Sequence, residues 1–270
     1  MLRFATILTV LSCTAVEFAA SLTPALQDSV HFVTPDRVTV RRMSEVPAID
    51  LAAGVHVRTV VGTTGSFSIG DFEPGSTAVL HHHTREQADI AIAGAFDMTL
   101  DDRVEKLGPG LAVVVPANVS HALANKSSER ATVIEFHTVR RPDLVPPRPV
   151  LTFPASAAPV RLPAGHLLVQ PMDRPIRESP SSAYWLRGET CLLAWRCLAS
   201  GTRAVELRAG AIERFVYLVR GEIQMTSAAG PSRIRAGELI VIPARATITI
   251  QSAGPGDAAV AEFIPAATEK

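Results

Sequence analysis

The chain carries three consecutive histidines, His81, His82 and His83, and a fourth, His121, follows after two short apolar segments. If residues 76–83 form a strand, His81 and His83 point to one side and His82 to the other, because side chains alternate along a strand. Two imidazoles then face one space. Imidazole nitrogens are suitable ligands for Zn, Ni, Mn, Fe or Cu, so binding of one divalent transition metal is the chemistry that these residue types allow.

The segments between these histidines are expected to be strands that position them. Residues 88–93 (ADIAIA) form an apolar run that ends at Gly94, and residues 111–115 (LAVVV) form a β-branched run that ends at Pro116. Both runs have the length and the boundaries of buried strands. The chain also has 20 prolines and 17 glycines, which together with many short Val, Ile and Leu runs indicate an all-β protein rich in turns.

The spacing of these residues resembles the two sequence motifs of the cupins. The matching positions are Gly75, His81, His83, Gln87 and Gly94 for the first motif, and Gly110, Pro116, His121 and Asn125 for the second. The resemblance implies an antiparallel jelly-roll barrel that holds one metal through four side chains, those of His81, His83, Gln87 and His121. Gln87 stands where cupins more often have glutamate.

An internal repeat with an offset of 127 residues divides the chain into two copies. Four landmarks share this offset: Gly94 and Gly221, Gly110 and Gly237, Pro116 and Pro243, and Glu135 and Glu262. We therefore expect two tandem barrels, a bicupin by resemblance. At this offset the metal-ligand positions fall on Arg208, Gly210, Arg214 and Ile248, which cannot hold a divalent cation. The second barrel is predicted to be structural, with an anion site at Arg208 and Arg214 as the alternative.

The predicted organisation has four parts. Residues 1–21 have the layout of a secretory signal peptide, with Arg3 before an apolar stretch. This layout predicts an exported protein, periplasmic or secreted, without stable membrane association. Residues 22–139 are expected to form the first barrel, residues 140–163 a proline-rich linker, and residues 164–270 the second barrel.

Composition and cysteine spacing limit the possible partners. Lys and Arg total 26 and Asp and Glu also total 26, so no net charge recruits nucleic acid or an anionic membrane. Cys191 and Cys197 lie in one predicted strand, and a strand rise of about 20 Å between them is too long for a disulfide. The cupin resemblance also implies a homodimer.

The predicted ligand set is neutral, because Gln87 replaces a carboxylate beside three imidazoles. Such a set leaves the charge of a divalent metal uncompensated, which favours polarisation of a carboxylate, carbonyl or enediol over oxygen chemistry. Glu86 is a competing ligand, although the motif spacing favours Gln87. We expect isomerisation, tautomerisation or lyase-type chemistry on a small carboxylated or sugar-derived substrate.

Two further residues are candidates for catalysis. In residues 131–139, Glu135 and His137 share one face of the predicted strand, and a carboxylate on that face can act as a general base. The stretch from Glu135 to Arg141 also resembles the tail of the pectin-degradation cupins, which use three histidines and one glutamine and act on unsaturated uronates. That resemblance implies a catalytic Glu135 and a substrate-orienting Arg141. A structural role for Glu135, repeated as Glu262, is the competing interpretation.

Two other functions fit the same sequence. One is a metal-dependent dioxygenase, and the other is a binding module that holds a small molecule without turnover. A Glu135→Ala variant that keeps its metal and loses its activity would favour an enzyme over a binding module.

Overall fold

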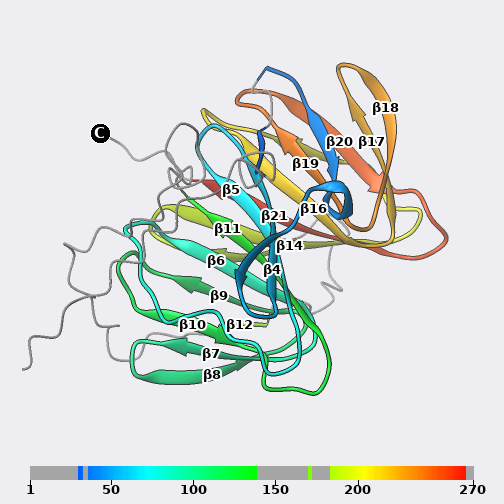
Figure 1. Cartoon of the computed structure of the whole chain (residues 1–270). Helices are drawn as coiled ribbons and strands as arrows, with labels where there is room; N and C mark the ends of the chain where they lie inside the picture. Colours follow the sequence, from blue (N-terminus) through cyan, green and yellow to red (C-terminus); the bar gives the residue numbers. More distant parts are fainter. Residues whose placement is uncertain (1–29, 33–35, 139–169, 172–182, 266–270) are drawn as a thin grey trace, which may run out of the picture.

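A computed structural model describes residues 30–32, 36–138, 170–171 and 183–265. The described chain consists of β-strands and one 3-10 turn, η1 (Met43–Glu45). The strands form two barrels, the first from the blue-to-green part of the chain and the second mainly from the yellow-to-red part (Figure 1). The predicted all-β fold with two tandem jelly-roll barrels is confirmed.

The first barrel consists of an eight-stranded sheet and a three-stranded sheet. The large sheet has the strand order β1-β4-β5-β11-β6-β9-β12, with β3 paired to β4, and the small sheet has the order β10-β7-β8. The strands are β1 (Val30–Phe32), β3 (Ile49–Ala52), β4 (Val55–Val61), β5 (Ser66–Phe72), β6 (Gln87–Ala93), β7 (Phe96–Leu100), β8 (Arg103–Leu107), β9 (Leu111–Val115), β10 (His121–Ala124), β11 (Ala131–His137) and β12 (Gln170–Pro171). A buried apolar cluster that includes Val57, Met98 and Val133 fills the space between the two sheets.

The second barrel repeats this plan with a six-stranded sheet, in the order β13-β14-β21-β16-β19-β2, and a four-stranded sheet, in the order β15-β20-β17-β18. The strands are β2 (Thr39–Arg42), β13 (Ala183–Arg187), β14 (Cys191–Leu198), β15 (Val205–Arg208), β16 (Arg214–Arg220), β17 (Glu222–Ser227), β18 (Gly230–Arg235), β19 (Glu238–Ile242), β20 (Thr247–Ser252) and β21 (Ala258–Pro265). Its interior is filled by a separate apolar cluster that includes Leu218, Ile240 and Val260.

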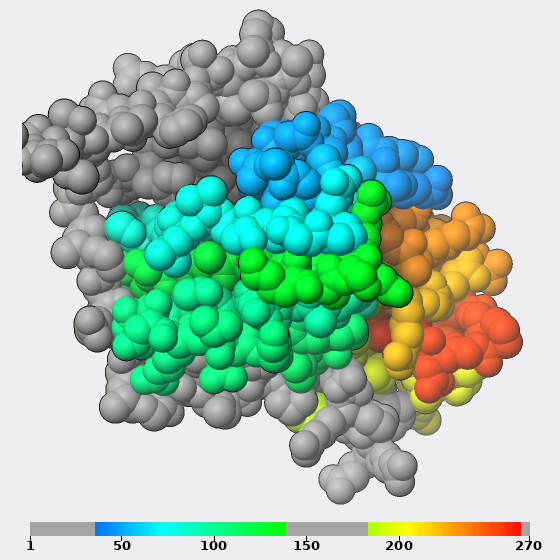
Figure 2. All heavy atoms as spheres, turned by 60° about the horizontal axis from the view of Figure 1, so that its bottom comes forward, coloured from blue at the N-terminus to red at the C-terminus, as the bar shows by residue number. Residues whose placement is uncertain are grey.

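Each barrel has one edge strand that comes from outside its own main stretch of sequence. Strand β2 lies between β1 and β3 of the first barrel in the sequence but pairs with β19 of the second, where Val40 lies opposite Ile240. Strand β12 follows the first barrel and pairs with β9, where Gln170 lies opposite Ala112. In Figure 2 the blue residues of the N-terminal segment lie against orange residues of the second barrel. The two barrels are therefore linked by sheet hydrogen bonds as well as by packing.

The interface between the barrels is built from equivalent residues of the two copies. Phe136 stacks on its counterpart Phe263, with ring centroids 4.7 Å apart and an interplanar angle of 18°. Both rings belong to one buried cluster that also includes Phe67, Phe215 and Tyr217. Contacts of a residue with its own counterpart are typical of two-fold symmetric dimers. The tandem barrels therefore pack like the two subunits of a homodimer within one chain.

Two glutamates make the interface reciprocal. The carboxylate of Glu86 accepts hydrogen bonds from the backbone N–H groups of Glu189 and Thr190 in the second barrel, at 2.9 and 2.8 Å. Its counterpart Glu213 accepts from the backbone N–H groups of Thr64 and Gly65 in the first barrel, at 2.7 and 3.0 Å. Each barrel thus binds a hairpin turn of the other through a buried carboxylate.

Both turns carry a glycine where the carboxylate approaches. A Cβ atom on Gly62 would lie 2.4 Å from Glu213 Oε1, and a Cβ atom on Gly188 would lie 2.3 Å from Glu86 Oε1. A side chain at either position would displace the carboxylate from its place against the turn. The two glycines therefore allow the carboxylates to reach the backbone.

Removing one of these carboxylates should destabilise the protein. In a Glu213→Ala variant the N–H groups of Thr64 and Gly65 lose their acceptor, and we expect a loss of about 2 to 4 kcal/mol in the free energy of unfolding. Urea denaturation followed by circular dichroism measures it. An alanine variant of Glu206, an exposed glutamate of the same barrel, is the control, and equal stability of the two variants would contradict the role of Glu213.

The expected strand over residues 76–83 is wrong. The segment is not a continuous strand, and its pairing with the neighbouring strand is limited to two isolated bridges, Thr77 with Ala124 and His81 with His121. The strands expected over residues 88–93 and 111–115 are confirmed as β6 and β9. The alternation of side chains between two faces therefore holds for β6 and β9, but it does not apply to the segment that carries His81 and His83.

The two cysteines behave as predicted, because both lie in β14 and both are free thiols. No helix among the described residues is long and apolar enough to span a membrane. The signal peptide predicted at residues 1–21, the linker at residues 140–163 and the side chain of Arg141 lie outside the described residues. Export and the proposed barrel boundaries accordingly stay predictions.

Candidate metal centre

Backbone pairing brings the three histidines together from two segments. His81 and His121 lie directly opposite each other and exchange both backbone hydrogen bonds, at 3.0 and 2.8 Å. The backbone oxygen of His83 accepts from the N–H group of Asn118 at 2.7 Å. Asn118 adopts a left-handed conformation with φ of 63°, which asparagine tolerates better than most residues. The turn before β10 thus closes against the segment that carries His81 and His83.

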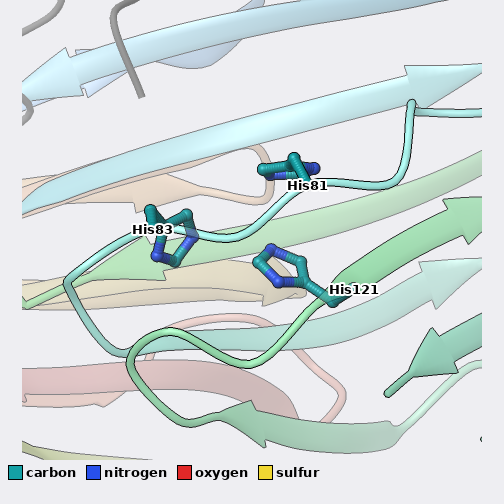
Figure 3. Close-up of side chains that lie close together, drawn as sticks. All are labelled: His81, His83 and His121. Carbon is teal, nitrogen blue, oxygen red and sulfur yellow. The ribbon is translucent and has the colours of Figure 1, made fainter. Parts of the chain in front are cut away.

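The three imidazole rings point toward one another (Figure 3). One ligand atom from each of His81, His83 and His121 can be chosen so that all three lie within 4.8 Å of one another. The ring centroids of His81 and His121 are 4.3 Å apart, and those of His83 and His121 are 4.9 Å apart. The irregular segment therefore achieves the convergence that was expected from a strand.

Backbone carbonyls hold all three rings in the same tautomer. The Nδ1 atom lies 2.8 Å from the Val79 oxygen in His81, 2.7 Å from the Arg85 oxygen in His83, and 2.9 Å from the Val119 oxygen in His121. A carbonyl oxygen only accepts hydrogen bonds, so each Nδ1 carries the proton and donates it. The Nε2 atom of each ring is left with a lone pair for a ligand.

Burial keeps two of these imidazoles neutral. Desolvation, followed by the charge of Arg85, lowers the pKa of His83 to about 4. Desolvation also lowers the pKa of His121 well below its usual value, with smaller contributions from His81 and His83. Neutral imidazole is the form that binds a metal, so burial prepares the rings for coordination.

Gln87 completes the cluster. Its Oε1 atom lies 2.9 Å from Nε2 of His83, and its Nε2 atom donates to both carboxyl oxygens of Asp89, at 2.9 and 3.0 Å. Because the proton of His83 is on Nδ1, its Nε2 atom and Oε1 of Gln87 are both acceptors, and they cannot form a hydrogen bond with each other. Two ligand atoms at about 2.1 Å from a metal and at right angles to each other lie about 3.0 Å apart.

The donor set fits a divalent transition metal. The Nε2 atom of His121 is buried and has no hydrogen-bond partner, which is costly for a polar atom unless a ligand binds it. A cation placed between this atom, His83 Nε2 and Gln87 Oε1 would give each of these three acceptors a partner. The nitrogen and oxygen donors suit Zn, Ni, Mn, Fe or Cu.

Glu86, the competing candidate ligand, lies away from this cluster. Its carboxylate binds the turn at residues 189–190 of the second barrel, as described above. Its backbone oxygen accepts from the N–H group of Thr138 at 3.2 Å. Glu86 and Gln87 therefore point to opposite sides of the sheet, one to the partner barrel and one to the histidines.

Polar residues continue from Gln87 across the inner face of the large sheet. In the first row, His137 of β11 lies opposite Gln87 on one side and Ser66 on the other. In the next row, Glu135 lies opposite Asp89 and Ser68. The His137 ring is 5.5 Å from the His83 ring between centroids. The predicted sharing of one face by Glu135 and His137 thus places both next to the metal centre.

Asp89 was missed by sequence analysis. It sits inside an apolar run, and only its separation of two residues from Gln87 indicates that both share a face. Burial raises the pKa of Asp89, and the charge of Glu135 raises it further, while the hydrogen bond from Gln87 opposes the shift. Two carboxyl groups therefore face each other beside the histidines.

The second barrel has no such cluster among the described residues. Its counterpart of the His81–His121 pair is Leu207 opposite Ile248, and both side chains are buried in the apolar core. The offset had assigned Arg208 to His81, which is wrong by one residue, because the copies differ in length just before Gly210. Arg208 is exposed, so it does not form an internal anion site with Arg214.

An ion-pair cluster occupies the interior of the second barrel. Glu262, the counterpart of Glu135, is fully buried and accepts from Arg196 Nε at 2.6 Å and from Arg214 Nη2. Arg214 stands at the position of Gln87, and its Nη1 atom also donates to the Arg208 backbone oxygen at 3.2 Å. A guanidinium therefore fills in the second barrel the place of the amide in the first.

Comparison with known proteins agrees with this geometry. Residues 68–137 match the family model of the cupin domain. Protein SchB of Streptomyces halstedii is 29% identical over 99 residues, which cover 35% of this chain and 71% of that protein.

Two solved structures share the fold. AerE from Microcystis aeruginosa has a TM-score of 0.63 at 15% identity and covers 82% of this chain and 96% of its own. Oxalate decarboxylase from Bacillus subtilis, a protein with Mn(II) centres, has a TM-score of 0.67 at 12% identity and covers 90% of this chain and 80% of its own. At these identities the likeness concerns the fold alone.

Proposed function

Because this chain contains a cupin domain, we propose that it is a metal-dependent enzyme acting on a small carboxylated or sugar-derived substrate. The observation that carries the proposal is the meeting of His83 Nε2 and Gln87 Oε1 at 2.9 Å, since both atoms are acceptors in the tautomer that the backbone imposes. His81 and His121 supply the other two ligands. When bound, the metal supplies Lewis-acid polarisation of a carboxylate or carbonyl oxygen.

The reaction class that fits the surrounding residues is isomerisation, tautomerisation or lyase-type chemistry. Each of these begins when a base removes a proton from carbon next to a carbonyl or carboxylate. Glu135 lies in the row next to the Gln87 row, opposite Asp89 and Ser68. Glu135 is therefore placed beside the metal centre, where its carboxylate can accept this proton.

The remaining polar groups suit binding of an oxygen-rich molecule. Thr59 and Ser68 are buried and share a hydrogen bond of 2.9 Å, and the hydroxyl of Ser66 is buried without a hydrogen-bond partner. Such hydroxyls bind hydroxyl or carboxylate oxygens of a substrate. Arg141, which the sequence indicates as the residue that orients a substrate carboxylate, lies outside the described residues.

Metal reconstitution followed by solvent exchange tests this proposal. The full chain is reconstituted separately with Mn(II), Fe(II), Ni(II) and Zn(II), starting with Mn(II) because the Bacillus subtilis relative in fold contains it. NMR in D2O then measures deuterium incorporation next to the carboxylate of keto acids and carboxylated sugars. We expect one metal equivalent and exchange that is lost in a Glu135→Gln variant with unchanged metal content.

The possible outcomes separate this proposal from its alternatives. Oxygen consumption that depends on Fe(II) and an acid substrate would replace it with a dioxygenase. Tight ligand binding with neither exchange nor oxygen consumption would replace it with a binding module. A protein that holds no metal after reconstitution would remove the basis of all three.

A further inference from the structure

We infer that Asp89 is the residue that makes Gln87 a metal ligand, by holding the side-chain amide with its oxygen toward the histidines. The inference rests on the metal site of the proposed function and adds a positioning residue to it. Asp89 acts through Gln87 and needs no contact of its own with the metal.

The contacts of the Gln87 amide are divided between its two ends. The Nε2 end donates to both carboxyl oxygens of Asp89, at 2.9 and 3.0 Å, and the Oε1 end faces His83 Nε2 at 2.9 Å. Both residues are almost completely buried, with Asp89 1% and Gln87 6% exposed. The amide therefore takes its orientation from protein groups and not from solvent.

The two orientations of an amide have nearly the same shape but opposite chemistry. Turned by 180°, Gln87 would place its oxygen against the acceptors of Asp89 and its NH2 group toward the imidazoles. An amide NH2 group has no available lone pair for a metal, so the turned amide is not a ligand. A carboxyl oxygen that accepts from Nε2 therefore selects the orientation in which Gln87 can bind a metal.

His83 does not provide this selection. Its Nδ1–H donates to the Arg85 carbonyl, so its Nε2 atom is an acceptor and would attract the NH2 end of Gln87 when no metal is present. Asp89 opposes that preference from the other side of the amide. Outer partners that orient a metal ligand typically contribute 10–100-fold to metal affinity.

A double-mutant cycle with cobalt(II) as the probe tests the inference. Isothermal titration measures the cobalt affinity of the full-length wild type, Asp89→Leu, Gln87→Ala and the double variant, and visible absorption reports the ligand set of bound cobalt. We expect Asp89→Leu to weaken binding about 10–100-fold and to alter the absorption bands. In the Gln87→Ala background the same change should have no further effect, because there is no amide left to orient.

Two further variants keep the test decisive. Asp89→Asn retains an acceptor oxygen for Gln87 Nε2, so it should bind cobalt within about threefold of the wild type, even if the leucine variant folds poorly. Thr132→Ala removes a polar group from the opposite face of β11, where its hydroxyl donates to Asp71, and should leave the affinity unchanged.

The outcomes distinguish this inference from the proposed function. Equal weakening by Asp89→Leu with and without Gln87 would overturn the inference, because Asp89 would then act as a ligand or as a charge. Unchanged affinity in Asp89→Leu would also overturn it and leave the metal site intact. If the wild type itself binds no cobalt or other divalent metal, the metal site and the inference both fail.

Discussion

Replacing His121 with alanine should lower the affinity of the protein for a divalent metal by about a hundredfold to a thousandfold. Structural metal sites with four ligands release about 10–16 kcal/mol on binding, which is roughly 2.5–4 kcal/mol for each ligand. The Nε2 atom of His121 is buried and has no hydrogen-bond partner in the protein, so it is available to the metal. Alanine removes this ligand atom and provides no substitute for it. Competition with a chromophoric chelator measures the affinity of the reconstituted protein.

His82 provides the matched control for this experiment. It adjoins two of the three clustered histidines in the sequence, yet it is not one of the residues whose ligand atoms converge. A His82→Ala variant should bind metal as the wild type does. Full metal loading in His121→Ala, or an equal loss in both variants, would show that the ligand assignment is wrong.

Replacing Glu262 with glutamine should destabilise the protein by about 3–5 kcal/mol. The substitution keeps the size of the side chain and removes the carboxylate that Arg196 and Arg214 share. Both guanidinium groups are buried, and a buried charge that loses its partner is strongly destabilising. The free energy of unfolding in guanidinium chloride, compared with that of the wild type, gives the effect.

The same substitution in the first barrel should behave differently. Glu135 is the counterpart of Glu262, but it lies opposite Asp89, so Glu135→Gln removes a charge next to another carboxyl group. We expect its stability to match or slightly exceed that of the wild type. A large loss in Glu135→Gln would favour a shared structural role for the repeated glutamate, and a small loss in Glu262→Gln would argue against the ion-pair cluster.

The spacing of Gly, His and Pro residues predicted much of the fold, because these residues fix turns and strand ends locally. The offset of 127 residues also predicted that Glu135 corresponds to Glu262, and both lie on the inner faces of their barrels. It failed at His81, where one extra residue in the second copy shifts the register. Which residues lie opposite each other depends on the backbone pairing across the sheet. A constant offset between two copies of a sequence carries no information about that pairing.

Other features have no local sequence signal. Strands β2 and β12 are short, and their exchange between barrels depends on which sheet edge lies nearby. The irregular path of residues 76–83 reflects only two bridges to the neighbouring strand. The importance of Asp89 was hidden because a single acidic residue in an apolar run has meaning only once its cross-strand neighbours are known.

The alternation of side chains along β6 and β11 separates the residues of the interface from those of the candidate site. Ala88, Ile90 and Phe136 face the partner barrel, while Gln87 and Asp89 face the histidines. Their counterparts follow the same division, since Phe215 and Phe263 pack in the interface and Arg214 points inward to Glu262. The inward-facing residues of the two barrels can therefore differ, a candidate metal set in one and an ion pair in the other, while the surface that joins the barrels stays the same.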